Sequence, residues 1–203
     1  MAIKQWKLDK WLKRAILQKD VEDARRSLVA GANPNHAMVE GEINSTPLIQ
    51  AVTKHPDLVD LLLEFGADVR GIDHMRATAL HFAGDHLVVA KLLAAGADPN
   101  ARSTDGSNPL HACSSIETAR LLIDAGTNPT ALNEMGELPW QSIARSLEGM
   151  GVSHLSHVPI VKSCHAAIDT LRALAECESL QGATGTVQMT KEEETAKAQG
   201  GRF

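Results

Sequence analysis

The sequence predicts an all-α solenoid, a row of stacked helix-turn-helix units. Two recurring phrases predict it. The phrase Gly-Ala-Asp/Asn-Pro and its variants recurs at intervals of 35, 30 and 30 residues, and the phrase Thr-Pro-Leu and its variants at 32, 30 and 30. The first begins at Gly31, Gly66, Gly96 and Gly126, and the second at Thr46, Thr78, Asn108 and Leu138. Two markers in phase at this period are typical of a solenoid, in which each unit covers the apolar faces of its neighbours.

Each period contains two predicted helices. In its second half, apolar residues recur at spacings of three and four and so share one side of a helix. They are Leu58, Val59, Leu61 and Leu62, then Leu87, Val88, Leu92 and Leu93, then Ile116, Ala119, Leu121, Leu122 and Ile123. We expect each of these helices to end at the Gly of the first phrase, which tolerates a left-handed backbone. The Thr or Asn before Pro in the second phrase predicts the N-cap of a short first helix.

A solenoid also needs a cap at each end. An apolar stripe backed by Lys and Arg predicts an N-terminal cap helix at about residues 3–18. Its members are Ile3, Trp6, Leu8, Trp11, Leu12, Ala15 and Ile16. We expect the repeats to run to about residue 147 and a C-terminal cap helix to cover about residues 159–180. Its predicted inner face is Ile160, Cys164, Ala167, Ile168, Leu171, Leu174 and Ala175. The predicted domain is therefore 1–180, and residues 181–203, without an apolar period, are expected to be a disordered tail.

The repeated phrases resemble the ankyrin repeat, whose pattern runs Gly-x-Thr-Pro-Leu-His-x-Ala, a helix with Leu-Leu, and Gly-Ala-Asp-x-Asn. Residues 106–113 and 78–83 match closely, and the resemblance covers about residues 7–147 in about five repeats. It implies an ankyrin-repeat solenoid with short β-hairpin-like turns. Units three and four have 30 residues where the family favours 33, so we expect a first helix about one turn shorter or a tighter connection. Asn44 and Arg76 replace a glycine of the pattern, and we expect those fingers to be bent differently.

The resemblance implies that a protein partner binds at the finger tips and the concave face. The candidate residues are Glu42, Ile43, His74, Met75, Arg76, Arg102, Thr104, Asp105, Glu134, Met135 and Glu137. Ile43, Met75 and Met135 would form a discontinuous apolar ridge edged by charge, the anatomy of an interface. Ordinary variety among turns also explains them, because single exposed apolar residues are common.

No catalytic residue, cofactor or metal site is predicted. Neither Gly-x-Ser-x-Gly nor a phosphate-binding loop occurs in the sequence. His81 and His111 recur in phase with the fold, and the resemblance implies that they tie neighbouring turns together. The alternative is a metal-dependent or enzyme-like role in residues 148–165. That segment holds the zinc-binding residue types His154, His157, Cys164 and His165, although their spacing is not that of a zinc site.

Charge is distributed unevenly along the chain. Residues 1–19 hold six Lys/Arg and one Asp, whereas residues 20–180 hold eleven Lys/Arg and twenty-one Asp/Glu. The acidic body argues against nucleic acid and is compatible with a basic protein surface. Three cysteines without framework spacing, no signal peptide and no apolar run long enough to span a membrane predict a soluble, cytoplasmic protein. Membrane contact through Trp6 and Trp11 is not expected, because the same stripe should close the solenoid.

The sequence therefore predicts a non-catalytic protein–protein interaction module. In the sharper version of this hypothesis, a small solenoid inhibits or masks its partner by occupying an active or assembly surface. In a further alternative, residues 181–203 carry a short recognition motif that the repeats display. The identity of the partner and the oligomeric state are left open.

Overall fold

The structure of the chain is a computed structural model, and it describes residues 4–40, 43–149 and 166–177. Its helices are α1 (Gln5–Gln18), α2 (Val21–Val29), α3 (Pro47–Lys54), α4 (Asp57–Glu64), α5 (Ala79–Phe82), α6 (His86–Ala94), the 3-10 helix η1 (Pro109–Ala112), α7 (Ile116–Asp124) and α8 (Pro139–Gly149). Strands β1 (Met38–Glu40) and β2 (Ile43–Ser45) pair as an antiparallel hairpin, with Val39 opposite Asn44. Residues 166–177 are also helical.

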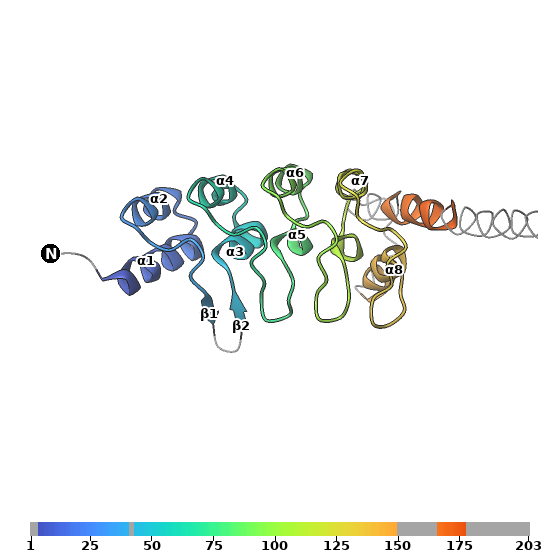
Figure 1. Cartoon of the computed structure of the whole chain (residues 1–203), viewed down its shortest axis with the longest axis horizontal. Helices are drawn as coiled ribbons and strands as arrows, with labels where there is room; N and C mark the ends of the chain where they lie inside the picture. The colour runs from blue at the N-terminus through green and yellow to red at the C-terminus, as the bar shows by residue number, and fades with distance from the viewer. Residues whose placement is uncertain (1–3, 41–42, 150–165, 178–203) are drawn as a thin grey trace, which may run out of the picture.

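The helices form a row two layers deep, which confirms the predicted all-α solenoid. One layer contains α2, α4, α6 and α7, and the other contains α1, α3, α5, η1 and α8 (Figure 1). The β1–β2 hairpin and three loops project from the side of the second layer. Helices α5 and η1 have four residues each where α3 has eight. The shorter first helix expected from the 30-residue period is therefore confirmed.

The helices begin and end where the local chemistry requires. Thr46, Asp85 and Ser115 are N-caps whose side chains accept a backbone N–H of the first turn, at 2.9–3.2 Å. The second helix of each unit ends before a glycine with φ between 80° and 98°. A side chain in this left-handed conformation would be strained, which explains why the phrase begins with glycine.

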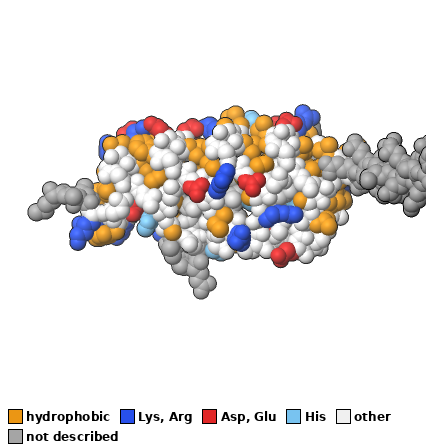
Figure 2. All heavy atoms as spheres, in the orientation of Figure 1, with side chains coloured by type: hydrophobic (Ala, Val, Ile, Leu, Met, Phe, Trp, Pro, Cys, Tyr) orange, Lys and Arg blue, Asp and Glu red, His pale blue; other side chains and the backbone are white. Residues whose placement is uncertain are grey.

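The core is one continuous aliphatic layer. The largest fully buried side chains are Leu12, Ile16, Leu48, Leu58, Leu62, Leu80, Leu92, Leu110, Leu122, Leu171, Val59 and Val89. Leu62, Leu92 and Leu122 are equivalent positions 30 residues apart, so each unit contributes the same leucine to the stack. Outside this core, hydrophobic side chains lie among charged ones on the visible face (Figure 2).

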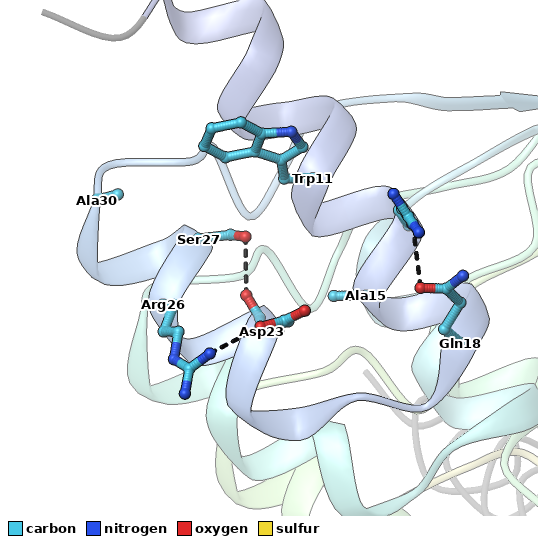
Figure 3. Close-up of a pocket in the computed structure, with 8 residues that line it drawn as sticks. Trp11, Ala15, Gln18, Asp23, Arg26, Ser27 and Ala30 are labelled. Carbon is cyan, nitrogen blue, oxygen red and sulfur yellow. Dashed lines mark hydrogen bonds and ion pairs between the residues drawn. The ribbon is translucent and has the colours of Figure 1, made fainter.

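The predicted N-terminal stripe is partly wrong. Leu8, Leu12 and Ile16 are buried in the core, but Trp6 is 57% and Trp11 48% exposed. Trp11 precedes Leu12, and adjacent helical residues point about 100° apart, so the predicted stripe was too wide for one helix face. Trp11 instead lines a pocket of about 400 Å³ between α1 and α2, opposite Ser27 (Figure 3). The sequence argument against membrane contact assumed that both indoles are packed in the solenoid, and their exposure removes that argument.

The C-terminal helix is described only in part. Between residues 166 and 177 it buries Ala167, Ile168, Leu171 and Ala175. The predicted inner residues Ile160 and Cys164, the helix ends at 159 and 180, and the predicted tail 181–203 lie outside the described residues. The domain boundaries therefore stay predictions.

The structural role predicted for the two repeated histidines is confirmed. Nδ1 of His81 accepts the Thr78 N–H at 3.1 Å, and its Nε2 lies 3.1 Å from the Ser107 carbonyl of the next finger. His111 repeats this arrangement with Asn108 and, at 3.2 Å, with the Glu137 carbonyl. An accepting Nδ1 and a carbonyl at Nε2 require the neutral ring with its proton on Nε2. Burial lowers the pKa of both histidines below the usual value.

These pKa shifts predict a loss of stability in mild acid. Between the lowered folded pKa and the unfolded value of about 6.5, the unfolded chain binds more protons, so stability falls as pH drops below about 6.5. Gln141 occupies the equivalent position in the next unit, and its Oε1 accepts the Leu138 N–H at 2.7 Å. In the variant His81→Gln plus His111→Gln, we therefore expect the melting temperature to vary less between pH 7.5 and 5 than in the wild type. Identical pH profiles for the two proteins would contradict this assignment.

Candidate protein-binding surface

Three fingers, residues 72–78, 102–108 and 132–138, share one repeated turn. The first turn residue is Asp73, Ser103 or Asn133, and its N–H donates to the carbonyl four residues later at 3.0–3.1 Å. The Asp73 carboxylate also accepts the N–H groups of Met75 and Ala77 at 2.8 and 2.9 Å, and Asn133 makes the equivalent pair of bonds. The turns are therefore held by short polar side chains bonded to their own backbone.

Neighbouring fingers are joined by backbone hydrogen bonds. The N–H of His74 donates to the Asn44 carbonyl at 3.0 Å, and the N–H of Thr104 to the Met75 carbonyl at 2.8 Å. The N–H of Glu134 donates to the Asp105 carbonyl at 2.8 Å. The tips consequently form one connected row rather than four independent loops.

Only one of the two fingers expected to bend differently does so. Arg76 has φ +58°, close to the values of 71° and 73° at the equivalent Gly106 and Gly136, and all three close the same turn. The finger of Arg76 therefore keeps the shape of its neighbours, which corrects the expectation. Asn44 lies in β2, so that finger is a hairpin instead.

The row of tips exposes apolar pairs. Met75 and Met135 are 48% and 61% exposed, as expected for the predicted ridge. Sequence reasoning missed Ile72 and Leu132, which are 48% and 53% exposed and precede each methionine by three residues. Ile72 and Leu132 are 60 residues apart, which is two repeat periods and the same separation as that of the two methionines, and this shared spacing was the signal that could have revealed them. Glu42 and the side chain of Ile43 lie outside the described part of the chain.

The polar and charged tip residues differ in their freedom to contact a partner. His74, Arg76, Thr104 and Glu134 are exposed. Arg102 is also exposed, but its guanidinium donates to the carbonyls of Gly106 and, at 2.9 Å, Leu132. The hydroxyl of Ser103, and to a smaller extent that of Ser107, donates to the Asp105 carboxylate, and these hydrogen bonds lower its pKa. Arg102 and Asp105 are therefore fixed parts of the middle finger.

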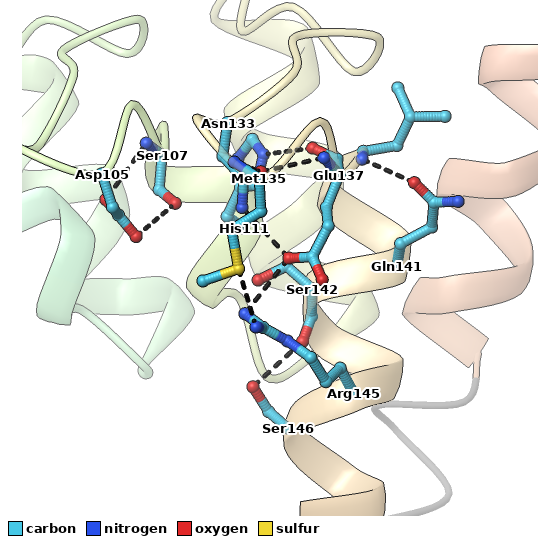
Figure 4. Close-up of polar contacts among 11 residues, drawn as sticks. Asp105, Ser107, His111, Asn133, Met135, Glu137, Gln141, Ser142, Arg145 and Ser146 are labelled. Atoms are coloured by element: carbon cyan, nitrogen blue, oxygen red, sulfur yellow. Dashed lines mark hydrogen bonds and ion pairs between the residues drawn. The ribbon is translucent and has the colours of Figure 1, made fainter.

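Arg145 fixes the last finger from helix α8. Its guanidinium lies 3.1 Å from the Glu137 carboxylate and 3.0 Å from the sulfur of Met135 (Figure 4). Glu137 also accepts the side-chain N–H of Asn133 at 3.1 Å. Met135 is thus exposed on a finger that has little freedom to rearrange.

Neither a metal site nor a membrane-spanning helix is found among the residues that the structure describes. Within residues 4–40, 43–149 and 166–177, no three His, Cys, Asp or Glu side chains gather to hold a metal ion. His154, His157, Cys164 and His165, on which the metal alternative rests, lie outside those ranges. No described helix combines the length and apolar character needed to cross a membrane.

The turn geometry predicts which substitutions the fingers tolerate. Replacing Asp73 by Ala leaves the N–H groups of Met75 and Ala77 without their acceptor, so we expect a loss of about 1–3 kcal/mol in the free energy of unfolding. Asp73→Asn is the matched control, because Asn133 holds the last finger in the same way, and its loss should be smaller. Urea unfolding measures both variants. Equal losses would show that the oxygen acceptor at residue 73 does not hold the turn.

The comparisons with known proteins agree with this architecture. A family model of ankyrin repeats in three copies matches residues 12–103. The human protein NF-kappa-B inhibitor delta is 35% identical over 113 residues, which cover 50% of this chain. The match spans 33% of that relative's length. Together with the phased phrases and the stacked helix pairs, these matches show that residues 12–103 belong to the ankyrin repeat family, whose repeats form protein–protein interaction modules.

Proposed function

We propose that this chain is a non-catalytic module that captures one protein partner across the row of finger tips and inhibits or masks it. The observation that carries the proposal is the pair of exposed apolar side chains on each of the fingers 72–78 and 132–138, namely Ile72 with Met75 and Leu132 with Met135. Apolar side chains in water favour burial against a partner, and methionine adapts its shape to varied surfaces.

The rigidity of the fingers supports binding at this row. Hydrogen bonds hold each described turn and join it to the next finger, so a partner would order few additional side chains when it binds. A smaller entropic cost leaves more of the contact energy as affinity. The middle finger places the fixed charges of Arg102 and Asp105 between the two apolar pairs, which would select partners by charge as well as by shape.

Inhibition is the finer part of the proposal. It is supported by the human relative, which is named as an inhibitor and of which the match covers a third. A stable complex of standard size would bury about 1,600 Å² in total. An interface of that size on a partner's active or assembly surface would block it by occupancy alone, without any reaction.

The net charge of −5 indicates which class of partner to expect. It supports a protein with a basic surface at long range and disfavours nucleic acid, whose phosphates need clustered Lys and Arg. We place the module in the cytoplasm, where thiols such as that of the buried Cys113 stay reduced.

The variant Met75→Asp plus Met135→Asp tests the proposed surface. Introducing a carboxylate at each apolar pair should lower the affinity for the captured partner at least about tenfold, because charge would replace apolar contact at the centre of the interface. Leu87→Asp is the control, because Leu87 is equally exposed but lies on α6, away from the fingers. Quantitative mass spectrometry after affinity capture from the source lysate measures all three proteins.

Unchanged capture by the double variant would reject the finger surface. For the inhibitory part, the purified chain is added to the captured partner and the partner's own activity or assembly is measured. Full activity in a saturated complex would leave a binding module and remove the inhibitor.

A further inference from the structure

Three arginines line one cavity of about 640 Å³ between the third and fourth units. Each of them breaks the repeat pattern of this chain. Arg70 stands where other units have Asn35 and Asn100, Arg76 where they have Gly106 and Gly136, and Arg102 where they have Ile72 and Leu132. Arg102 holds the middle finger through the carbonyls of Gly106 and Leu132, but Arg70 and Arg76 hold no described part of the fold, so their presence in one cavity indicates a function.

The first departure opens the cavity. Asn35 clamps the next unit: its side-chain amide donates to the Gly66 carbonyl at 3.1 Å and accepts the Asp68 N–H at 2.7 Å. Asn100 clamps Gly126 and Asn128 in the same way, at 2.8 and 2.9 Å.

Arg70 makes no such clamp. The carbonyl of Gly96 and the N–H of Asp98 consequently have no hydrogen-bond partner among the described residues, and both residues line the cavity. A backbone donor is therefore left open beside the guanidinium groups.

The second departure costs conformational energy. Arg76 adopts φ +58°, which a glycine adopts without strain. Within the described part of the chain, neither Arg70 nor Arg76 forms an ion pair or hydrogen bond through its side chain. Glycine at residue 76 would remove this strain and would lose no described hydrogen bond, so the arginine indicates a role outside the turn.

The cavity is locally basic in an acidic chain. Its wall carries Arg70, Arg76 and the fixed Arg102 against one carboxylate, that of Asp98. Guanidinium groups and a free backbone N–H together match the oxygen atoms of a carboxylate. Ile72 lines the same cavity and belongs to the exposed apolar pair of finger 72–78, so the cavity is continuous with the proposed partner surface.

We propose that this cavity, the arginine groove, binds an acidic peptide segment of the protein partner, with an Asp or Glu carboxylate between Arg70 and Arg76. The inference rests on the proposed function and names the chemistry of its partner. The negative net charge of the whole chain attracts basic surfaces at long range. The groove is locally positive and binds an acidic segment at contact distance, so the two effects do not conflict.

The test uses the full chain and a fluorescein-labelled hexaglutamate peptide, with binding followed by fluorescence anisotropy. We expect binding that weakens as salt rises from about 50 to about 500 mM. The variant Arg70→Asn plus Arg76→Gly restores residues that this chain uses at the equivalent positions and should lower the affinity at least about tenfold. Arg120→Gln, at an exposed arginine on α7 outside the groove, should bind like the wild type.

The restoring variant guards against loss of binding by unfolding. Asn at residue 70 can re-form the clamp to Gly96 and Asp98, and glycine relieves the strain at residue 76, so its melting temperature should equal or exceed that of the wild type. Three further probes define the ligand: hexalysine, a phosphoserine peptide and single-stranded RNA. Hexaglutamate should bind more tightly than any of them.

Several results would overturn the inference. One is that the wild type does not bind hexaglutamate at about millimolar peptide. Another is that the restoring variant binds it with an affinity within about twofold of the wild type. A third is that hexalysine, the phosphoserine peptide or RNA binds more tightly than hexaglutamate. If the groove fails in this way while Met75→Asp plus Met135→Asp still abolishes capture, the arginine groove is wrong and the finger surface stands.

Discussion

The structure depends on one constraint: no unit of this chain can bury its apolar side alone. Each unit is only two helices deep and its fully buried residues are aliphatic. The leucines of one unit are therefore shielded from water only when the units on both sides cover them. Leu62, Leu92 and Leu122 occupy the same position in successive units, and Leu80 and Leu110 do so in successive first helices. Polar contacts follow the same logic, because His81 and His111 bond to the following finger and Asn35 and Asn100 to the following turn. Stability in such an array is a sum of units and of nearest-neighbour interfaces.

The binding surface that we propose is made of residues that this stacking leaves exposed. The backbone bonds that tie the fingers into a row also fix the separation of the apolar pairs at residues 72/75 and 132/135. Residues that depart from the repeat pattern are the ones that point to binding, because the repeated residues are explained by the stacking of the units. Arg70 and Arg76 replace residues with clear structural duties, and the fold tolerates them at the cost of a missing clamp and a strained turn. In our proposal, these two substitutions give the solenoid a partner without any change in its core.

Periodicity predicted most of the architecture, because a repeated unit repeats its physical reasons. The glycine ends, the Thr and Asn caps and the shortened first helices followed from phase and residue type, and the bridging role of the histidines followed from the resemblance to the ankyrin repeat. The edges of helix faces did not, since Trp11 and Leu12 differ by one position yet one is exposed and the other buried. Nor could the sequence tell which tip charges are occupied: the bonds of Arg102 to Gly106 and Leu132 form only when two fingers lie side by side. The arginine groove was hidden for the same reason, because it joins residues of two units.

The dependence of each unit on its neighbours is tested most directly by hydrogen exchange in the variant Leu92→Ala. Leu92 is fully buried in α6, and its truncation should lower the free energy of unfolding by about 2–5 kcal/mol. If the units are held by one another, backbone amides of α4 and α7 will lose protection together with those of α6. Faster exchange confined to α6, with α4 and α7 as protected as in the wild type, would contradict the account.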